Sequence, residues 1–310
     1  MPRTSEEVSA FPTKILLAAD GSKDAQLATA TAVGLAKSTS SKLDVVHVFV
    51  LPSKTLDKSL SFDNSSREAA EEKARARLEE LVDKTEAFGG AIEKSHLRTG
   101  QPDVEIVALA EELGAGLVIV GSRGLSPRKR ALMGSVSESV VRHAHCSVLV
   151  VRGSGRSEDR DYLPGRILLA FDGSRDAEAA ARAALEISNV VGSELHVLCV
   201  VQLPHAGPFA WEVDVEKIKQ DARSMVDGQA QQVGAIEGKV KEVHLASGKP
   251  YAEIVRFAEE LGAGLVVMGS RELGRLQRAL MGSVSESVVR HAHCPVMVVR
   301  REKNSRREEA

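Results

Sequence analysis

The chain has 310 residues, with 41 Lys and Arg against 43 Asp and Glu, for a formal net charge of −2. This length suits two domains, and the balanced charge argues against a dedicated nucleic-acid or anionic-membrane binder, whose phosphate contacts need a basic excess. Aromatic residues make up only 3%, so the cores must consist of Ala, Val, Leu and Ile, as in parallel sheets between helices.

Apolar strand-like runs alternate with helical patterns along the first half of the chain. We expect strands at 14–19, 43–50, 93–98, 117–121 and 147–151, and helices at roughly 22–38, 66–88, 102–113 and 135–145. Strands that alternate with helices long enough for crossover connections predict an α/β fold with a parallel, doubly wound sheet.

The second half of the chain repeats the first. The segment ILLAADGS at 15–22 returns as ILLAFDGS at 167–174, and residues 131–146 are identical to residues 279–294. Such a long period indicates a duplicated domain rather than a solenoid. We therefore expect two tandem five-stranded sheets, with a first domain at 11–152, a polar linker at 153–163, a second domain at 164–300 and a charged tail at 301–310.

The cysteine count and the length of the apolar runs predict where in the cell the protein is located. Three cysteines, Cys146, Cys199 and Cys294, cannot form a disulfide framework, which favours a reducing cytosol. Residues 1–13 lack the apolar core of a signal peptide, and the longest apolar runs, such as 116–121, are far shorter than a bilayer span. We expect a cytoplasmic protein without a membrane segment.

The loop between the fourth strand and the next helix has the features of an anion site. Gly121 and Gly124 allow the backbone to turn and to approach a ligand closely. The segment Ser135-Val-Ser-Glu138 is typical of a capping box, and a glycine-bearing loop before a helix N-terminus commonly holds phosphate. Four basic residues, Arg123, Arg128, Lys129 and Arg130, add positive charge. The alternative interpretation is a structural turn with a solvated basic face.

The second half repeats this loop with one departure. Gly269 and the pair Gly282-Ser283 are kept, whereas Glu272 stands in place of Gly124. Gly274, two positions on, would restore flexibility, but the carboxylate of Glu272 would repel a phosphate. Both interpretations of the second site stay open.

Two polar features near strand and helix ends allow more than one role. Asp20 and Asp172, which follow the first strand of each half, either face a base or ribose, bind Mg²⁺, or form an Asx turn or cap for the next helix. The His-Ala-His-Cys segments at 143–146 and 291–294 are typical of helix ends, because only one residue separates their histidines. We expect neither a metal site nor catalytic residues from these patterns.

Two common nucleotide-binding motifs are missing. The Gly-Lys pairs at 238–239 and 248–249 are not followed by Ser or Thr, which excludes a Walker loop. The fingerprint Gly-x-Gly-x-x-Gly follows neither first strand. We therefore do not expect NAD or FAD.

These residues resemble the universal stress proteins. The motif Gly121-x2-Gly124-x9-Gly134-Ser135, the aspartate after the first strand and the Val-Val-Arg that ends each half are similar to that family's, over nearly the whole chain. The resemblance implies Rossmann-like, adenine nucleotide alpha hydrolase-like domains with strand order 3-2-1-4-5. Because family members commonly dimerise through the last strand, we expect 147–151 and 295–299 to pair within one chain, as a pseudo-dimer, or between chains, as a homodimer.

The resemblance also implies ATP as the ligand, with Mg²⁺ left open. In the first half the implied positions are Asp20 and Val48 for the adenosine end, Gly121, Arg123 and Gly124 for the ribose and phosphates, and Gly134, Ser135, Val136 and Ser137 for the triphosphate. In the second half they are Asp172, Val200, Gly269, Arg271, Gly282, Ser283, Val284 and Ser285.

We therefore expect an ATP-binding stress-response or signalling protein whose output depends on nucleotide occupancy. One alternative is a slow ATPase or nucleotide-dependent transferase that uses the same pocket, although no residue is an obvious general base for water. A second alternative is a nucleotide-free interaction scaffold in which both loops are structural.

Overall fold

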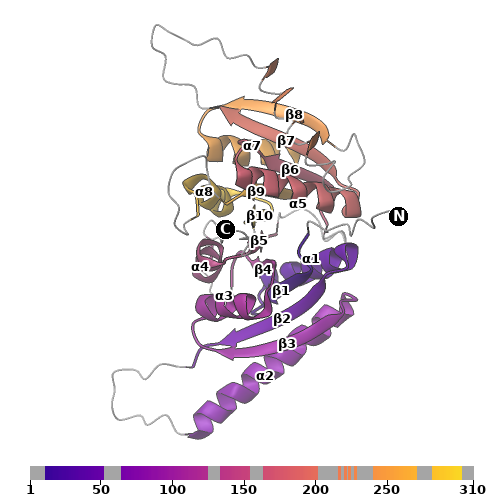
Figure 1. Ribbon diagram of the computed structural model, residues 1–310. Helices are drawn as coiled ribbons and strands as arrows, with labels where there is room; N and C mark the ends of the chain where they lie inside the picture. Colours follow the sequence, from indigo (N-terminus) through magenta and orange to yellow (C-terminus); the bar gives the residue numbers. More distant parts are fainter. Residues whose placement is uncertain are drawn as a thin grey trace, which may run out of the picture.

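The computed structural model describes residues 11–51, 64–124, 133–153, 163–201, 240–270 and 281–301, with short helical pieces between 216 and 228. Figure 1 shows two similar halves that meet along their sheets. The segments 125–132 and 271–280, which hold most of the two predicted basic loops and both Arg271 and Glu272, lie outside the described residues.

Each half has a five-stranded parallel sheet. The strands of the first half are β1 (Lys14–Ala18), β2 (Lys42–Phe49), β3 (Ile92–Thr99), β4 (Leu117–Gly121) and β5 (Ser147–Val151). Those of the second half are β6 (Arg166–Ala170), β7 (Glu194–Val201), β8 (Val240–Ser247), β9 (Leu265–Gly269) and β10 (Val296–Val299). The order β3-β2-β1-β4-β5, mirrored in the second half, confirms the expected 3-2-1-4-5 arrangement.

The last strands join the halves into one ten-stranded sheet. β5 and β10 run antiparallel, with Val148 opposite Val298 and Val150 opposite Val296. The pairing expected from the resemblance therefore occurs within this chain. Each domain covers the sheet edge that the other would otherwise leave open.

Helices cover both faces of the sheet. One face carries α1 (Lys23–Thr39), α2 (Asn64–Ala87) and α5 (Arg175–Val191), and the other carries α3 (Pro102–Leu113), α4 (Ser135–His143), α7 (Pro250–Leu261) and α8 (Ser283–His291). A single apolar core on each face runs through both halves. The halves therefore share their buried interior as well as their sheet.

Local sequence explains where several helices begin and end. The hydroxyls of Ser22 and Ser174 accept hydrogen bonds from the helix backbone and cap α1 and α5. α3 and α7 each begin with proline, which suits a position whose N–H has no helical partner. Both end at a glycine, Gly114 or Gly262, with a φ of 61° or 64° that other residues rarely adopt.

Candidate functional site

The candidate site lies at the carboxyl ends of β1 and β4. The chain proceeds from β1 to β2 and β3 on one side, then crosses to β4 and β5 on the other, so the winding reverses between β1 and β4. Ligands of doubly wound sheets bind at such a reversal. Asp20 follows β1 here, and the loop that leaves β4 leads into α4.

Gly124 lies against the carboxylate of Asp20. A Cβ atom at Gly124 would be only 2.6 Å from Asp20 Oδ2, and one at Gly134 would be 3.7 Å from the Gly124 nitrogen. The structure thus brings together three of the positions expected from the sequence. The absence of a side chain at Gly124 keeps the space between Asp20 and the start of α4 clear.

Asp20 and Asp172 both form Asx turns. The Ser22 N–H donates to Asp20 Oδ1 at 2.9 Å, and the Ser174 N–H donates to Asp172 Oδ1 at 3.0 Å. The turn that the sequence allowed is therefore present, while Ser22 and Ser174 provide the helix caps. Asp20 is half-buried and Asp172 is exposed.

α4 begins with backbone donors that have no partner within the helix. Gly134 is the N-cap residue, and the Glu138 N–H makes the first helical bond, to the Gly134 carbonyl at 3.0 Å. The N–H groups of Ser135, Val136 and Ser137 therefore have no acceptor within the helix. α8 has the same first helical bond, from the Glu286 N–H to the Gly282 carbonyl at 3.0 Å.

The predicted capping box is wrong. Ser135 is the first helical residue rather than the N-cap, which is Gly134 and has no side chain to accept a bond. Glu138 is therefore one position too late to reach back to the N-cap, and its carboxylate pairs with arginines instead. α4 also ends at His143, two residues earlier than predicted.

Two hydrogen bonds hold the start of α4 on the end of β4. The Gly134 N–H donates to the Ser122 carbonyl at 2.8 Å, and the Ser137 hydroxyl donates to the Gly121 carbonyl at 2.6 Å. Because its proton goes to the sheet, the Ser137 hydroxyl does not serve as a donor to a ligand. Its backbone N–H and the exposed residue Ser135 remain at the helix end.

The second domain repeats this attachment at the start of α8. The Gly282 N–H donates to the Ser270 carbonyl at 2.8 Å, and the Ser285 hydroxyl donates to the Gly269 carbonyl at 3.0 Å. Ser283 is exposed and Val284 is half-buried beside it. The attachment of the helix start to the strand end is therefore the same in both domains, although Arg271 and Glu272 are not among the described residues.

Gly121 and Gly269 are explained by packing between a strand and a helix. A Cβ at Gly121 would be 2.9 Å from the Ala25 nitrogen in the first turn of α1. A Cβ at Gly269 would likewise be 2.9 Å from the Ala177 nitrogen in α5. The close approach predicted at these glycines is thus made by the protein's own helix.

Asp24 is a residue of the site that sequence analysis missed. Its carboxylate is 6% exposed in the first turn of α1 and accepts a hydrogen bond from the Ser122 hydroxyl at 2.6 Å. The same carboxylate binds Arg123, with Nε 3.0 Å from Oδ2. Asp176 receives the Ser270 hydroxyl at 2.8 Å in the second domain. This residue could have been found from the sequence, because the dipeptide Asp-Ala occurs at the same position of both repeats.

Arg77 of α2 was also missed, because the helical pattern marks it only as an exposed charge. Its Nη2 donates to the Asp20 carbonyl at 3.3 Å, and its guanidinium lies over Gly21. Val48 and Val200, expected at the adenosine end, are half-buried near the carboxyl ends of β2 and β7. The described site thus offers backbone donors, two arginines, a carboxylate and an apolar side chain.

Comparison with known proteins identifies the family that this fold and this site belong to. The profile of the Universal stress protein family matches residues 12–152 and 164–300. The chain belongs to the universal stress protein family. A universal stress protein of Methanocaldococcus jannaschii is 36% identical over 152 residues, which is 46% of this chain and 86% of that protein. One of Mycolicibacterium smegmatis is 30% identical over 242 residues, 75% of this chain and 79% of that protein.

A solved universal stress protein is similar to nearly the whole of this chain. The crystal structure of a universal stress protein from Archaeoglobus fulgidus DSM 4304 covers 94% of this chain and 99% of its own, with 28% identity and a TM-score of 0.68. Within the part of this universal stress protein that the structure describes, no helix is long and apolar enough to cross a membrane.

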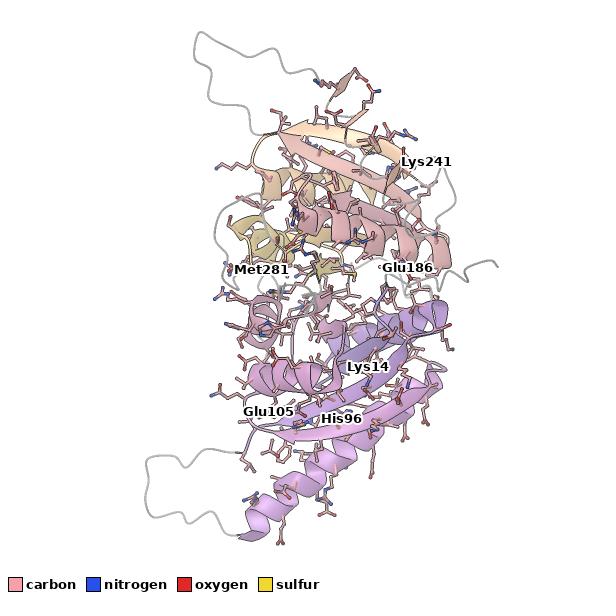
Figure 2. All side chains as sticks on the ribbon, in the orientation of Figure 1. Lys14, His96, Glu105, Glu186, Lys241 and Met281 are labelled. Atoms are coloured by element: carbon pink, nitrogen blue, oxygen red, sulfur yellow. The ribbon has the colours of Figure 1, made fainter. Side chains whose placement is uncertain are left out.

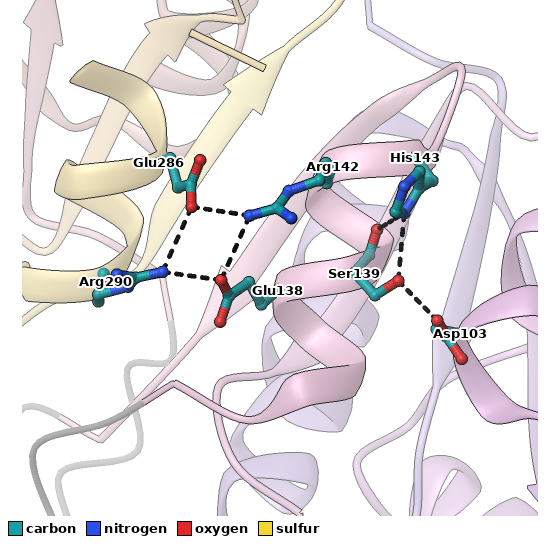
Figure 3. Close-up of polar contacts among 7 residues, drawn as sticks. All are labelled: Asp103, Glu138, Ser139, Arg142, His143, Glu286 and Arg290. Carbon is teal, nitrogen blue, oxygen red and sulfur yellow. Dashed lines mark hydrogen bonds and ion pairs between the residues drawn. The ribbon is translucent and has the colours of Figure 1, made fainter. Parts of the chain in front are cut away.

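The two universal stress protein domains exchange ion pairs between α4 and α8. Arg142 lies 2.8 Å from Glu286 and Arg290 lies 2.7 Å from Glu138, and each arginine also contacts the glutamate of its own helix (Figure 3). Glu138 follows directly on the candidate phosphate-binding turn. The helix that would hold a ligand in one domain is therefore attached to its counterpart in the other.

The arginine of each Val-Val-Arg motif caps a helix of the opposite domain. Arg152, after β5, donates to the carbonyls of Val289 and Ala292 at the end of α8. Arg300, after β10, donates to the carbonyls of Val141 and Arg142 at 2.8 and 3.1 Å. Burial lowers the pKa of the Arg152 guanidinium. The motif therefore serves the contact between the domains.

Asp103, Ser139 and His143 lie together but do not form a catalytic triad (Figure 3). The Ser139 hydroxyl donates to Asp103 Oδ2 at 2.6 Å. His143 Nδ1 lies 2.9 Å from the Ser139 carbonyl, which only accepts, so this nitrogen carries a proton. It is therefore not a base for the hydroxyl. The group has the geometry of a helix-end contact.

Proposed function

We propose that the first domain binds ATP at the carboxyl ends of β1 and β4, and that the protein is a nucleotide-dependent stress-response or signalling protein. The observation that carries this proposal is the start of α4, where three backbone N–H groups without helical partners lie beside Gly124 and Asp20. A helix N-terminus combines free donors with the positive end of the helix dipole, and both favour phosphate.

The surrounding residues fit the rest of the nucleotide. Val48 supplies an apolar surface for the base, and the Asp20 carboxylate accepts from a ribose hydroxyl or binds a Mg²⁺ that accompanies the phosphates. Arg123 and Arg77 supply positive charge near the same edge. A triphosphate carries more negative charge than these groups neutralise, which favours Mg²⁺ as its companion.

The second domain has the same frame but a different loop. The attachments of α8 match those of α4, whereas Glu272 replaces the glycine at the position of Gly124. We expect the carboxylate of Glu272 to weaken phosphate binding by repulsion. The proposal therefore assigns the tighter site to the first domain.

Nucleotide occupancy would act through stability. ATP at about 100 times its dissociation constant stabilises the bound form by about 2.7 kcal/mol. α4 carries both the proposed phosphate contacts and the ion pairs to α8. Binding of ATP to α4 would therefore also stabilise the contact between the two domains. The proposal places the protein in the cytoplasm, where ATP is abundant and its three free cysteines stay reduced.

Nucleotide chromatography of the denatured protein tests the proposal, together with a thermal shift on addition of Mg-ATP. We expect bound adenine nucleotide and a higher melting temperature with Mg-ATP. Absence of both would contradict ATP binding and favour the nucleotide-free scaffold. Phosphate release at several turnovers per second would instead favour the enzyme.

A reciprocal pair of variants locates the site. Gly124→Glu places the second domain's carboxylate in the first domain, next to Asp20, and should remove most of the thermal shift. Glu272→Gly makes the converse change and should increase the shift. Equal ATP binding by wild type and both variants would contradict the assignment to these loops.

A further inference from the structure

A cluster of two histidines and a glutamate lies on the second domain, away from the candidate nucleotide site. His196 is on β7, and Glu242 and His244 are on β8, with His196 directly opposite Glu242 in the register. Alternate residues of a strand share a face, and His244 contacts Phe257 of α7, with ring centroids 4.5 Å apart. The cluster therefore lies on the face of the sheet that α7 covers, with His196 and Glu242 near the starts of their strands and His244 in the middle of β8.

The ligand atoms of these three side chains converge. One nitrogen of each imidazole and one oxygen of Glu242 all lie within 4.8 Å of one another. His196 Nδ1 is 3.1 Å from His244 Nε2, and these are the two nitrogens that would bind the ion. Glu242 Oε1 lies 3.7 Å from the other nitrogen of the same ring, His244 Nδ1, so the Glu242 side chain must turn to reach the ion. His196 is 7% exposed, and its Nε2 has no hydrogen-bond partner among the described residues.

We propose that His196, Glu242 and His244 bind one divalent transition-metal ion of the zinc class. Two imidazoles and one carboxylate are a common protein ligand set for zinc, with the remaining position left to water. Zinc–ligand distances of about 2.0–2.2 Å put neighbouring ligand atoms of a tetrahedral site about 3.3 Å apart, close to the separation of the two imidazole nitrogens. The Glu242 side chain is 64% exposed and has room to close on the ion.

The charge beside the buried histidine also suits a cation. The Glu194 carboxylate, 3.9 Å from His196 Nε2, adds negative charge beside the cluster. The sequence did not reveal the site, because His196 is distant along the chain from Glu242 and His244 and no short motif contains all three.

The first domain provides a comparison within the same chain. The corresponding register positions hold Asp44 opposite Lys94, with His96 two residues further on (His96 is labelled in Figure 2). His96 Nε2 lies 3.7 Å from Asp44 Oδ1. The ammonium group of Lys94 replaces a metal ligand with a positive charge. We therefore infer that the ion binds to the second domain alone.

Zinc titration of the untagged full-length protein in competition with a chromophoric chelator tests the proposal, without nucleotide, so that its outcome is independent of ATP binding. Wild type should bind one Zn²⁺ per chain. Loss of an outer-shell partner costs about 10- to 100-fold in metal affinity, so Glu242→Gln and His244→Gln, which each remove a direct ligand, should cost at least as much. His96→Gln is the matched control and should leave zinc affinity unchanged.

Two further measurements make the result decisive. Circular dichroism and melting temperature without zinc establish that the variants fold, which is expected for Glu242→Gln because this side chain is exposed. Co²⁺ should give the intense visible absorption of a four-coordinate site in wild type and not in His244→Gln. Failure of wild type to bind stoichiometric zinc would overturn the proposal and leave the 3.1 Å contact as a histidine–histidine hydrogen bond. Zinc retained with full affinity by folded Glu242→Gln and His244→Gln would overturn it as well.

Discussion

Arg123 is bound to Asp24 at the edge of the candidate nucleotide site. Arg123 Nε lies 3.0 Å from Asp24 Oδ2 and Nη2 lies 3.3 Å from Oδ1, while the Ser122 hydroxyl donates to Oδ2 at 2.6 Å. The positive charge expected to face phosphates is therefore partly neutralised within the protein. For Arg123 to bind a phosphate, it must exchange a carboxylate partner for the ligand.

Asp24→Asn should destabilise the fold and tighten ATP binding. The buried Ser122 hydroxyl and the Arg123 guanidinium lose a charged acceptor, which costs about 1–3 kcal/mol; Arg123 is 38% exposed, so its share is the smaller one. ATP should bind more tightly because Arg123 no longer has a competing anion. Urea unfolding and ATP titration measure the two effects. Asp176→Asn is the control and should destabilise the second domain without changing ATP binding in the first.

Gly121→Ala should destabilise the protein through overpacking. The new methyl group would lie 2.9 Å from two backbone atoms of α1, so a helix must shift, at a cost of about 1–3 kcal/mol. Gly165→Ala is the control, because a Cβ there meets nothing within 4 Å. Equal melting temperatures for the two variants would contradict the packing role of Gly121.

Arg152→Ala should weaken the contact between the domains. It removes two hydrogen bonds from a half-buried guanidinium to the end of α8, and bonds to charged groups contribute about 1.5–3 kcal/mol each. Arg152→Lys should restore only part of the loss, because an ammonium group lacks the planar fork that reaches both carbonyls. Thermal unfolding tests both, and full rescue by lysine would contradict the bidentate role.

Reversing one charge in the α4–α8 ion pairs should lower the melting temperature, and reversing its partner should restore it. Glu138→Arg places a third positive charge beside Arg142 and Arg290 and should lower the melting temperature, more at low salt than at high salt. Adding Arg290→Glu should recover most of the loss. The pairs are about one-third exposed, so each is worth only about 0.2–1 kcal/mol. No recovery in the double variant would show that the helices do not meet there.

The three cysteines should be unreactive at neutral pH. Burial raises the pKa of Cys146, Cys199 and Cys294 to about 11, and only the thiolate reacts. Iodoacetamide at pH 8 should modify the native protein far more slowly than the protein in guanidinium. The raised pKa also stabilises the fold below about pH 9, and this contribution is lost as the pH rises toward about 11. Rapid native labelling of any of the three would contradict the prediction for that residue.

The fold was predictable because its signals are local. The alternation of apolar runs with amphipathic helices reports which residues are buried, and the repeat shows the same pattern twice. The predicted start of α4 at residue 135 is correct, but its N-cap was placed one residue too late, because capping patterns are also read from local sequence. Ser135 and Glu138 have the spacing of a capping box, but the bond from Gly134 to Ser122 decides where the helix begins.

The location of the candidate site was predictable from the sequence, but the contacts between its residues were not. Asp20, Gly124 and Gly134 come together as expected, because the carboxyl ends of parallel strands share one edge of the sheet. The partners of Arg123 and of the Ser137 hydroxyl were not predictable. They depend on how closely α1 and α4 approach β4, which no sequence spacing encodes.

The sequence by itself determined that one α/β domain occurs twice, where its strands and helices lie, and which two loops are candidate phosphate sites. Only the tertiary structure decided that Arg152 and Arg300 cap helices of the opposite domains, that Gly121 makes room for a helix, and that His196 meets His244. The physical reason is that periodicity records the burial of each residue in its own element. The partner of a buried polar group is set by strand register and helix docking between segments that are far apart in the chain.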